Sequence, residues 1–400
     1  MKFLAILALI VPLAASAQMH DMSHMQHGQS DPAGDLLMRQ VSGTGMNPSA
    51  AAPHMTMTSY GGWILMLHGL AFVSAVDESG PRGENKLFST NWLMGMADRP
   101  LAGGHLMLRS MLSLEPLTVR TYYPELFQTG ETIHGRPIVD GQHPHDFFME
   151  LAAEYAHSIG ADTVGYVYAA PFGDPALGPV AYPHRASAAE IPQAALSHHV
   201  QDSTHIAGSV ITAGAQHGML GVAVSGFHGR EPDENRWDID TGRIDSWSTR
   251  VTFDPTPNWS AQISTGHLHH PEASEPGDVQ RTTASVSFSD NDLNTSVVFG
   301  HNDRSEGRSV SSLLGEATVR FRNRNYVTGR AEIVDKDELS VAGVHRIKAL
   351  TLGYSRDIFD MNSVSVAVGA NVTGYSIPDA LKSAYGDPRS IYLFLRLRGH

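Results

Sequence analysis

The chain of 400 residues contains no cysteine and carries a formal net charge of −13 at neutral pH. The lack of thiols excludes disulfide bonds and thiolate-bound zinc, so any metal must be held by histidine, methionine or carboxylate side chains. The acidic balance argues against nucleic acid as a partner, because nucleic acid selects basic surfaces.

The first seventeen residues predict a cleaved secretory signal peptide. Lys2 supplies a positive start, residues 3–13 are apolar, and the sequence "ASA" at 15–17 fits a small-residue cleavage site. The apolar run is too short to cross a membrane as a helix, and no later segment has eighteen consecutive apolar residues. We therefore expect an exported mature chain that begins at Gln18.

The predicted mature N-terminus is rich in soft and borderline metal ligands. Thioether sulfur favours Cu(I), whereas imidazole suits Cu(II) and other late metals. We expect residues 18–56 to form a flexible periplasmic segment that binds metal, with copper as the first candidate and no cofactor required. The alternative is a low-complexity linker without a ligand. The candidate ligands are Met19, His20, Met22, His24, Met25 and His27.

This tail resembles the Met/His-rich leaders of outer-membrane copper resistance proteins of the B type. The resemblance covers residues 19–27, and the rest of the chain shows no motif of that family's barrel. It implies copper handling by the tail alone.

From residue 57 onward, apolar and polar residues alternate with a period of two. In 363–373, valines and an alanine share one face, and mostly serine, asparagine and threonine share the other. Such alternation indicates strands with one apolar face. Sixteen segments predict strands, at 62–76, 86–97, 104–115, 147–158, 162–170, 204–215, 218–228, 246–255, 258–268, 280–289, 293–302, 312–322, 325–334, 346–357, 362–375 and 390–398.

Short and long connections alternate between these predicted strands. Turns such as "IGAD", "TPN" and "RNR" alternate with long loops, including 116–146 and 171–203. An even strand number, short turns at one end and long loops at the other are typical of outer-membrane barrels. We therefore predict that residues 57–400 form an all-β, antiparallel transmembrane barrel of about sixteen strands, with 12–14 as the alternative. A periplasmic β-sandwich or propeller is the competing fold, although no repeat indicates propeller blades.

Several segments of the body carry a second resemblance. "DGQHPHDFFMELAAEY", "GFHGREPDENRWD", "FDPTPNWSAQISTG" and "RTTASVSF" lie between about 140 and 290, and "SIYLFLRLR" lies near the end. With these segments the chain resembles a family of uncharacterised secreted bacterial proteins of outer-membrane or porin type. The resemblance implies a fold and an outer-membrane location, and it brings no catalytic residue.

An outer-membrane location implies particular partners. We expect outer-membrane lipid and lipopolysaccharide, the barrel assembly machinery, and small solutes or metal ions in the lumen; a homo-oligomer is compatible with the sequence. A sixteen-stranded barrel is wide enough for an aqueous channel. Charge rows in a pore bias which solutes pass, although these charges can also simply pair with each other. The predicted lumen charges are Glu316, Arg320, Arg322, Arg330 and Glu332, with Arg396 on the last strand.

The two long loops contain clustered histidines. The first ends with His143, His145 and Asp146, and the second contains His198 and His199. Loops of about thirty residues are usually functional or folded on themselves. We expect both to fold inward, so that these candidate metal ligands converge at the mouth or inside the lumen.

Three interpretations of "HPHD" at 143–146 remain open. The H-x-H pair is similar to the start of an amidohydrolase metal site, but that fold needs parallel strands alternating with helices. The imidazoles can instead sense or pass on a divalent metal. We favour a structural role, in which these side chains hydrogen-bond loop backbone and fix the loops against the wall.

The sequence thus predicts a porin or channel-like outer-membrane barrel linked to copper or other metal handling. One alternative is a copper resistance protein whose barrel is mainly an anchor. Another is an outer-membrane hydrolase, for which Ser197-His198 is a candidate pair. We assign no catalytic residue and expect no enzyme, because nucleophile and phosphate-binding motifs are missing in any suitable context.

Overall fold

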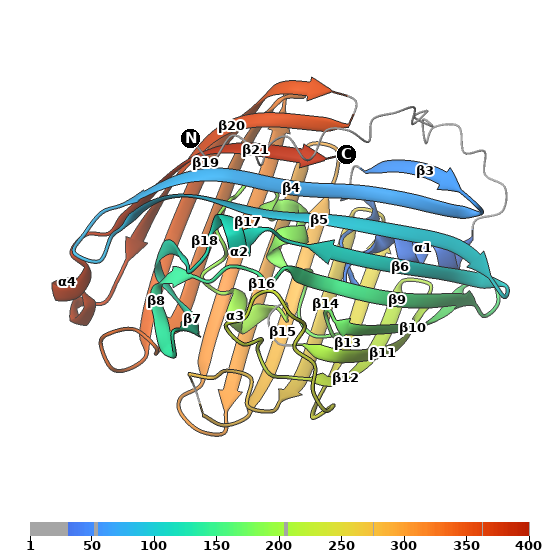
Figure 1. The fold of residues 1–400 in the computed structure, drawn as a ribbon, viewed down its shortest axis with the longest axis horizontal. Coiled ribbons are helices and arrows are strands. Elements are labelled where there is room, and N and C mark those ends of the chain that lie inside the picture. Colours follow the sequence, from blue (N-terminus) through green and yellow to red (C-terminus); the bar gives the residue numbers. More distant parts are fainter. Residues whose placement is uncertain (1–30, 52–54, 204–206, 275, 362, 400) are drawn as a thin grey trace.

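The structure is a computed structural model that describes residues 31–51, 55–203, 207–274, 276–361 and 363–399. Sixteen long antiparallel strands form a closed barrel, which confirms the predicted fold (Figure 1). They are β4 (Trp63–Glu78), β5 (Asn85–Leu101), β6 (Gly104–Leu112), β9 (Phe148–Ser158), β10 (Thr163–Phe172), β11 (Gly208–His217), β12 (Leu220–His228), β13 (Ser246–Thr256), β14 (Trp259–Leu268), β15 (Val279–Ser289), β16 (Leu293–Arg304), β17 (Val310–Phe321), β18 (Asn325–Lys336), β19 (His345–Met361), β20 (Val364–Ser376) and β21 (Arg389–Gly399).

Each of the sixteen predicted strands overlaps one of these observed strands. The barrel closes where β21 pairs with β4, from Ser390 opposite Glu78 to Gly399 opposite Gly69. A short strand that the sequence did not predict, β3 (Thr56–Tyr60), pairs with the remaining part of β4. Closure therefore leaves the ring of long strands without a free edge.

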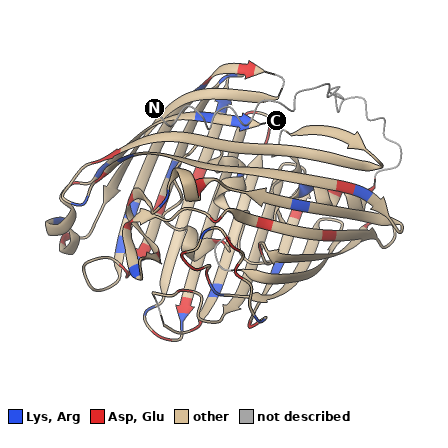
Figure 2. Cartoon of the chain, viewed as in Figure 1, with Lys and Arg blue, Asp and Glu red and all other residues tan. Residues whose placement is uncertain are grey.

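Apolar side chains face outward on the strands, and polar side chains face the lumen. On β19, Leu350 and Leu352 are 53% and 60% exposed, whereas Thr351 between them is 3% exposed. The long strands are mostly uncharged along their length (Figure 2). This is the reverse of a water-soluble protein, in which large apolar side chains are mostly inside.

The two ends of the barrel differ in their connections. At one end, here called the turn side, consecutive strands are joined by two to four residues, as at 102–103, 218–219 and 257–258. At the other end, the loop side, the connections are longer and include residues 113–147 and 173–207. Among the described residues, no helix is long and apolar enough to cross a membrane.

Three segments fold inside the ring of strands. The N-terminal segment holds α1 (Pro32–Arg39), β1 (Gln40–Ser42), β2 (Gly45–Met46) and η2 (Ser49–Ala51). The first long loop holds α2 (Glu115–Thr118) and the two-stranded sheet of β7 (Tyr123–Ile133) and β8 (Arg136–Gln142). The second holds η3 (Tyr182–His184), η4 (Ala186–Ala188) and α3 (His198–Gln201). A further helix, α4 (Asp379–Tyr385), lies in the loop between β20 and β21.

The N-terminal segment corrects one expectation. A flexible segment was predicted over 18–56, but residues 31–51 are folded and largely buried. Asp31 caps α1 by accepting a hydrogen bond from the Ala33 amide at 3.2 Å. The helix then buries Leu36 and Leu37 in a cluster that includes Met107 on β6. The contacts that order this segment come from the barrel wall, which local sequence does not reveal.

Candidate functional site

The second long loop crosses the lumen and is held by buried ion pairs. Arg185 pairs with Glu316 on β17, and Glu190 pairs with Arg396 and Arg398 on β21. We call residues 182–190 the crossing segment. The charged side chains of this segment are almost fully buried. Each therefore needs its oppositely charged partner, because a buried charge without a partner destabilises the fold.

The crossing segment divides the lumen into two unequal parts. On the turn side, a vestibule of about 460 Å³ is lined by strand residues such as Asn294, Arg320 and Asp357, and the crossing segment forms its floor. Beyond this floor, a pocket that contains His143 and His145 has a volume of about 30 Å³. The cavity on the loop side is therefore far smaller than the vestibule.

Most, but not all, of the charged residues that were predicted on the lumen face lie there. Glu316, Arg330 and Glu332 are buried on the lumen face, as is Arg396. Arg320 lines the vestibule, 3.7 Å from Asp292. The placement of Arg322 on the lumen face was wrong: it is exposed in the turn between β17 and β18, because β17 ends at Phe321. Glu316 accepts hydrogen bonds from both Arg185 and Arg330, so these lumen charges pair with each other.

His145 and Asp146 fix the first long loop in place. Glu115 accepts a hydrogen bond from the His145 amide at 2.9 Å and lies 3.0 Å from Nδ1 of its ring. Burial lowers the pKa of His145, but the carboxylates of Glu115, Asp146 and Glu131 together outweigh burial and the net shift is upward. Asp146 lies 3.3 Å from Arg236 in the loop after β12, and burial raises its pKa to about 7. Both contacts fit the structural interpretation of "HPHD".

The other three predicted ligands in the loops converge on one point. His143, His198 and His199 each place a ring nitrogen within 4.8 Å of the others. The ring centroids of His198 and His199 are 4.1 Å apart, and those of His143 and His199 are 5.7 Å apart. Burial holds the pKa of all three well below the usual range. Burial therefore favours the neutral form of these imidazoles, which has a lone pair to donate.

Backbone carbonyls contact Nδ1 of two of these histidines. Nδ1 of His198 lies 2.7 Å from the carbonyl oxygen of Ala195, and Nδ1 of His143 lies 3.1 Å from that of Pro144. A carbonyl oxygen can only accept, so Nδ1 of His143 carries the proton and its lone pair is on Nε2. Nδ1 of His198 also lies 3.1 Å from the amide nitrogen of Gln128, so either tautomer of His198 has a partner there. Histidines that bind metals commonly have this outer hydrogen bond.

Glycines and wall residues make room for this cluster. A Cβ atom at Gly130 in β7 would lie 2.5 Å from Cε1 of His199, and φ of this glycine is +116°. Gly300 on β16 similarly lets the carbonyl of Val200 approach the wall. Arg281, buried on the lumen face of β15, donates to the His199 carbonyl and so ties α3 to the barrel wall. Sequence reasoning did not identify these supports because they come from distant strands.

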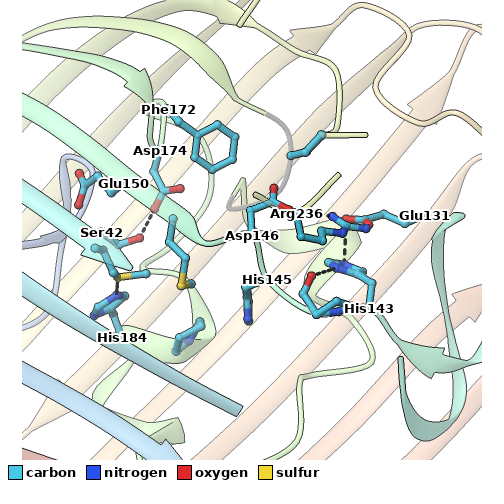
Figure 3. A pocket seen from close by; sticks show the side chains of 15 residues that line it. Ser42, Glu131, His143, His145, Asp146, Glu150, Phe172, Asp174, His184 and Arg236 are labelled. Atoms are coloured by element: carbon cyan, nitrogen blue, oxygen red, sulfur yellow. Dashed lines mark hydrogen bonds and ion pairs between the residues drawn. The ribbon is translucent and has the colours of Figure 1, made fainter. Parts of the chain in front are cut away.

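Carboxylates surround the three histidines, and the sequence analysis missed them. Glu131 Oε1 lies 3.2 Å from Nε2 of His143, and Glu231 Oε1 lies 3.6 Å from Nδ1 of His199. Glu272 and Glu231 form a second potential ligand group with His199. In Figure 3, Glu131 and Arg236 lie beside His143, whereas Ser42, Asp174 and His184 line the far side of the pocket. The only sequence signal for these acids was their place in long loops.

The hydrolase alternative gains no support from the candidate pair. The Ser197 hydroxyl lies 3.0 Å from Oε1 of Glu332 and 3.1 Å from Oε1 of Gln201, and each of these oxygens can accept its one proton. Nδ1 of the neighbouring His198 is bonded to a backbone carbonyl. The hydroxyl is thus held by acceptors other than a histidine base, which nucleophilic catalysis would require.

Comparison with known proteins shows the fold and no closer relationship. No family model and no curated protein matches the chain. Among solved structures, OmpF of Salmonella typhi in complex with daunomycin has a TM-score of 0.57 at 10% identity, over 86% of this chain and 99% of that one. An anion-selective porin from Comamonas acidovorans has 0.52 at 9%, over 84% and 100%, and OprB of Pseudomonas putida has 0.52 at 10%, over 84% and 94%. This chain therefore has the fold of the porin-type barrels.

Proposed function

We propose that this protein is an outer-membrane channel of porin type whose passage is narrowed by its own lumen segments. The closed barrel with an apolar outside and a charged inside carries the proposal. Only a closed barrel or a helix satisfies its backbone in lipid. A barrel of this strand number has space for a water-filled lumen.

Exposed aromatic residues support the placement in a membrane. Near the turn side, large aromatic side chains project from several strands at exposures of 39–80%. Such girdles are typical of the membrane–water interface of outer-membrane barrels. At the loop-side end of β13, Trp247 is 49% exposed and supplies a residue for the opposite interface. The turn-side residues are Tyr60, Phe253, Trp259, Phe321 and Phe359.

Outer-membrane barrels place their short turns in the periplasm. In that orientation, the vestibule opens toward the periplasm. The face of the crossing segment that points away from the vestibule is turned toward the cell exterior. The vestibule carries both Arg320 and Arg398 as well as Asp290 and Asp360. We infer a narrow path for small hydrophilic solutes or ions, with low conductance and weak charge preference.

Conductance in planar lipid bilayers tests this proposal. Heat-modifiable migration on gels would first show that the purified chain is a folded barrel. We expect small, discrete conductance steps from the folded protein, smaller than those of an open sixteen-stranded porin. A folded, inserted barrel without any steps would contradict a channel function.

Copper handling rests on residues 19–27, which lie outside the described residues. It stays a prediction that supplements the channel. Deleting 19–27 should lower copper binding and copper tolerance without changing the conductance steps. Unchanged copper binding and tolerance would exclude the tail as a copper ligand.

A further inference from the structure

The cluster of His143, His198 and His199 has no part in the channel proposal. It lies where the two long loops meet, enclosed between the first-loop hairpin and α3. The three imidazoles come from two different loops, and burial of both loops inside the barrel brings them together. The three imidazoles are buried with a ring nitrogen of each within 4.8 Å of the others, so they form a set of nitrogen ligands around one point.

The contact between His143 and Glu131 is informative. The proton of His143 is on Nδ1, so Nε2 presents a lone pair toward Glu131 Oε1 at 3.2 Å. Two electron-rich atoms in contact must share a positive charge, either a proton or a metal cation. A metal cation needs several ligands, whereas a shared proton needs only these two atoms. The imidazoles that face one another beside this contact can supply those ligands, which favours the metal cation.

We propose that His143, His198 and His199 bind one divalent late transition-metal cation, for which Zn²⁺ is the best match. Imidazole nitrogen is a preferred ligand of Zn²⁺. Mg²⁺ and Ca²⁺ prefer six or more oxygen ligands, and Cu(I) prefers sulfur. Three protein ligands with a fourth position for Glu131 or water correspond to an open tetrahedral site.

The geometry requires only a small closure. Zinc binds imidazole at about 2.0–2.1 Å, which places tetrahedral nitrogens roughly 3.3 Å apart. The three nitrogens lie within 4.8 Å of one another, so shifts of the rings by about 1 Å suffice. Arg236 and Lys336 add positive charge nearby, and Glu131, Glu231 and Glu272 offset it.

Zinc binding by the folded chain tests the proposal, in a background without residues 19–27 so that the tail does not contribute. Purified barrel is loaded with ZnCl₂, dialysed and analysed for bound zinc, with heat-modifiable migration as the test of folding. We expect one retained equivalent, lost in His198→Ala and in His143→Ala. The exposed group of His269, His270 and Asp278 is a second possible zinc site. Its double variant His269→Ala/His270→Ala is the matched control and should retain the buried equivalent.

Two further measurements keep the test decisive if histidine variants fold poorly. Co²⁺ loading should produce the visible absorption of a tetrahedral site, which surface adsorption does not. Gly130→Ala keeps every ligand but displaces the His199 ring, so it should weaken zinc binding about 10–100-fold, as outer-sphere changes do.

Two results would overturn the site: a folded barrel without retained zinc, or retention unchanged in His143→Ala and His198→Ala. The proposal does not rest on channel function. Zinc retention and conductance are separate measurements, so either can fail alone.

Discussion

The turn-side and loop-side halves of the lumen share the same wall strands but differ in what fills them. The vestibule of about 460 Å³ is lined largely by wall side chains at the ends of short turns. On the loop side, the hairpin, the crossing segment and the loop after β12 line a pocket of about 30 Å³ by His143. The strand number therefore sets how wide a lumen can be, whereas the inserted segments decide how much of it stays open.

The halves also differ in how they hold charge. In the vestibule, Arg320 is half-buried and its nearest acid is 3.7 Å away. At the floor, Glu316 is enclosed and accepts from both Arg185 and Arg330. Solvent screens the first arrangement, so it contributes little to stability. The second is a network in which removing one partner leaves buried charge behind.

The largest effect should come from releasing the crossing segment. The double variant Arg185→Ala/Glu190→Ala removes its ion pairs to β17 and β21. We expect the conductance steps in planar bilayers to grow several-fold, because the floor of the vestibule becomes mobile and the two halves join. Lys382→Ala/Asp379→Ala, which removes an exposed pair on α4, is the control and should leave the steps unchanged. Equal steps in all three proteins would show that the crossing segment does not limit passage.

Breaking the network at its centre should cost stability. Glu316→Gln leaves Arg185 and Arg330 enclosed without the carboxylate that they share, at a cost of about 3–5 kcal/mol in the free energy of unfolding. Urea titration followed by gel migration measures the effect. Asp379→Asn, in the exposed pair on α4, should not change it. A Glu316→Gln barrel as stable as the wild type would mean that water reaches this network.

A third change tests the wall that both halves share. Leu352 is 60% exposed at the middle of β19. If lipid covers it, Leu352→Arg should destabilise the barrel by about 2–4 kcal/mol in bilayers. Leu352→Ala is the milder control. Refolding into vesicles at several urea concentrations measures both variants. An arginine without effect at this position would argue that the outer face meets water.

The smallest expected effect concerns selectivity in the vestibule. Arg320→Glu replaces a positive with a negative charge on the vestibule lining. The reversal potential across a salt gradient should shift toward cations, with step size nearly constant, because the narrow part lies elsewhere. Arg322→Glu, two residues away in the exposed turn, makes the same charge change and should shift the potential less. Equal shifts of the reversal potential in the two variants would mean that the charge acts from anywhere near the pore entrance, and not from the vestibule lining.

Much of this architecture followed from sequence because alternation is a local property. In a strand, successive side chains point to opposite faces, so a period of two already separates the outer Leu350 and Leu352 from the inner Thr351. Connection lengths then separated turn side from loop side. The same rule wrongly extended the predicted strand to Arg322, because a period of two does not mark where a strand ends and its turn begins.

The lumen was decided by tertiary structure. The sequence placed His143 and His199 in two loops, but only the inward folding of both loops brings their rings to 5.7 Å. It grouped His145 with His143, whereas Glu115 draws His145 into a different contact. Local patterns determine which face of a strand meets the lumen. Pairing inside the lumen depends on residues far apart in the chain, and their proximity exists only after the barrel has closed around them.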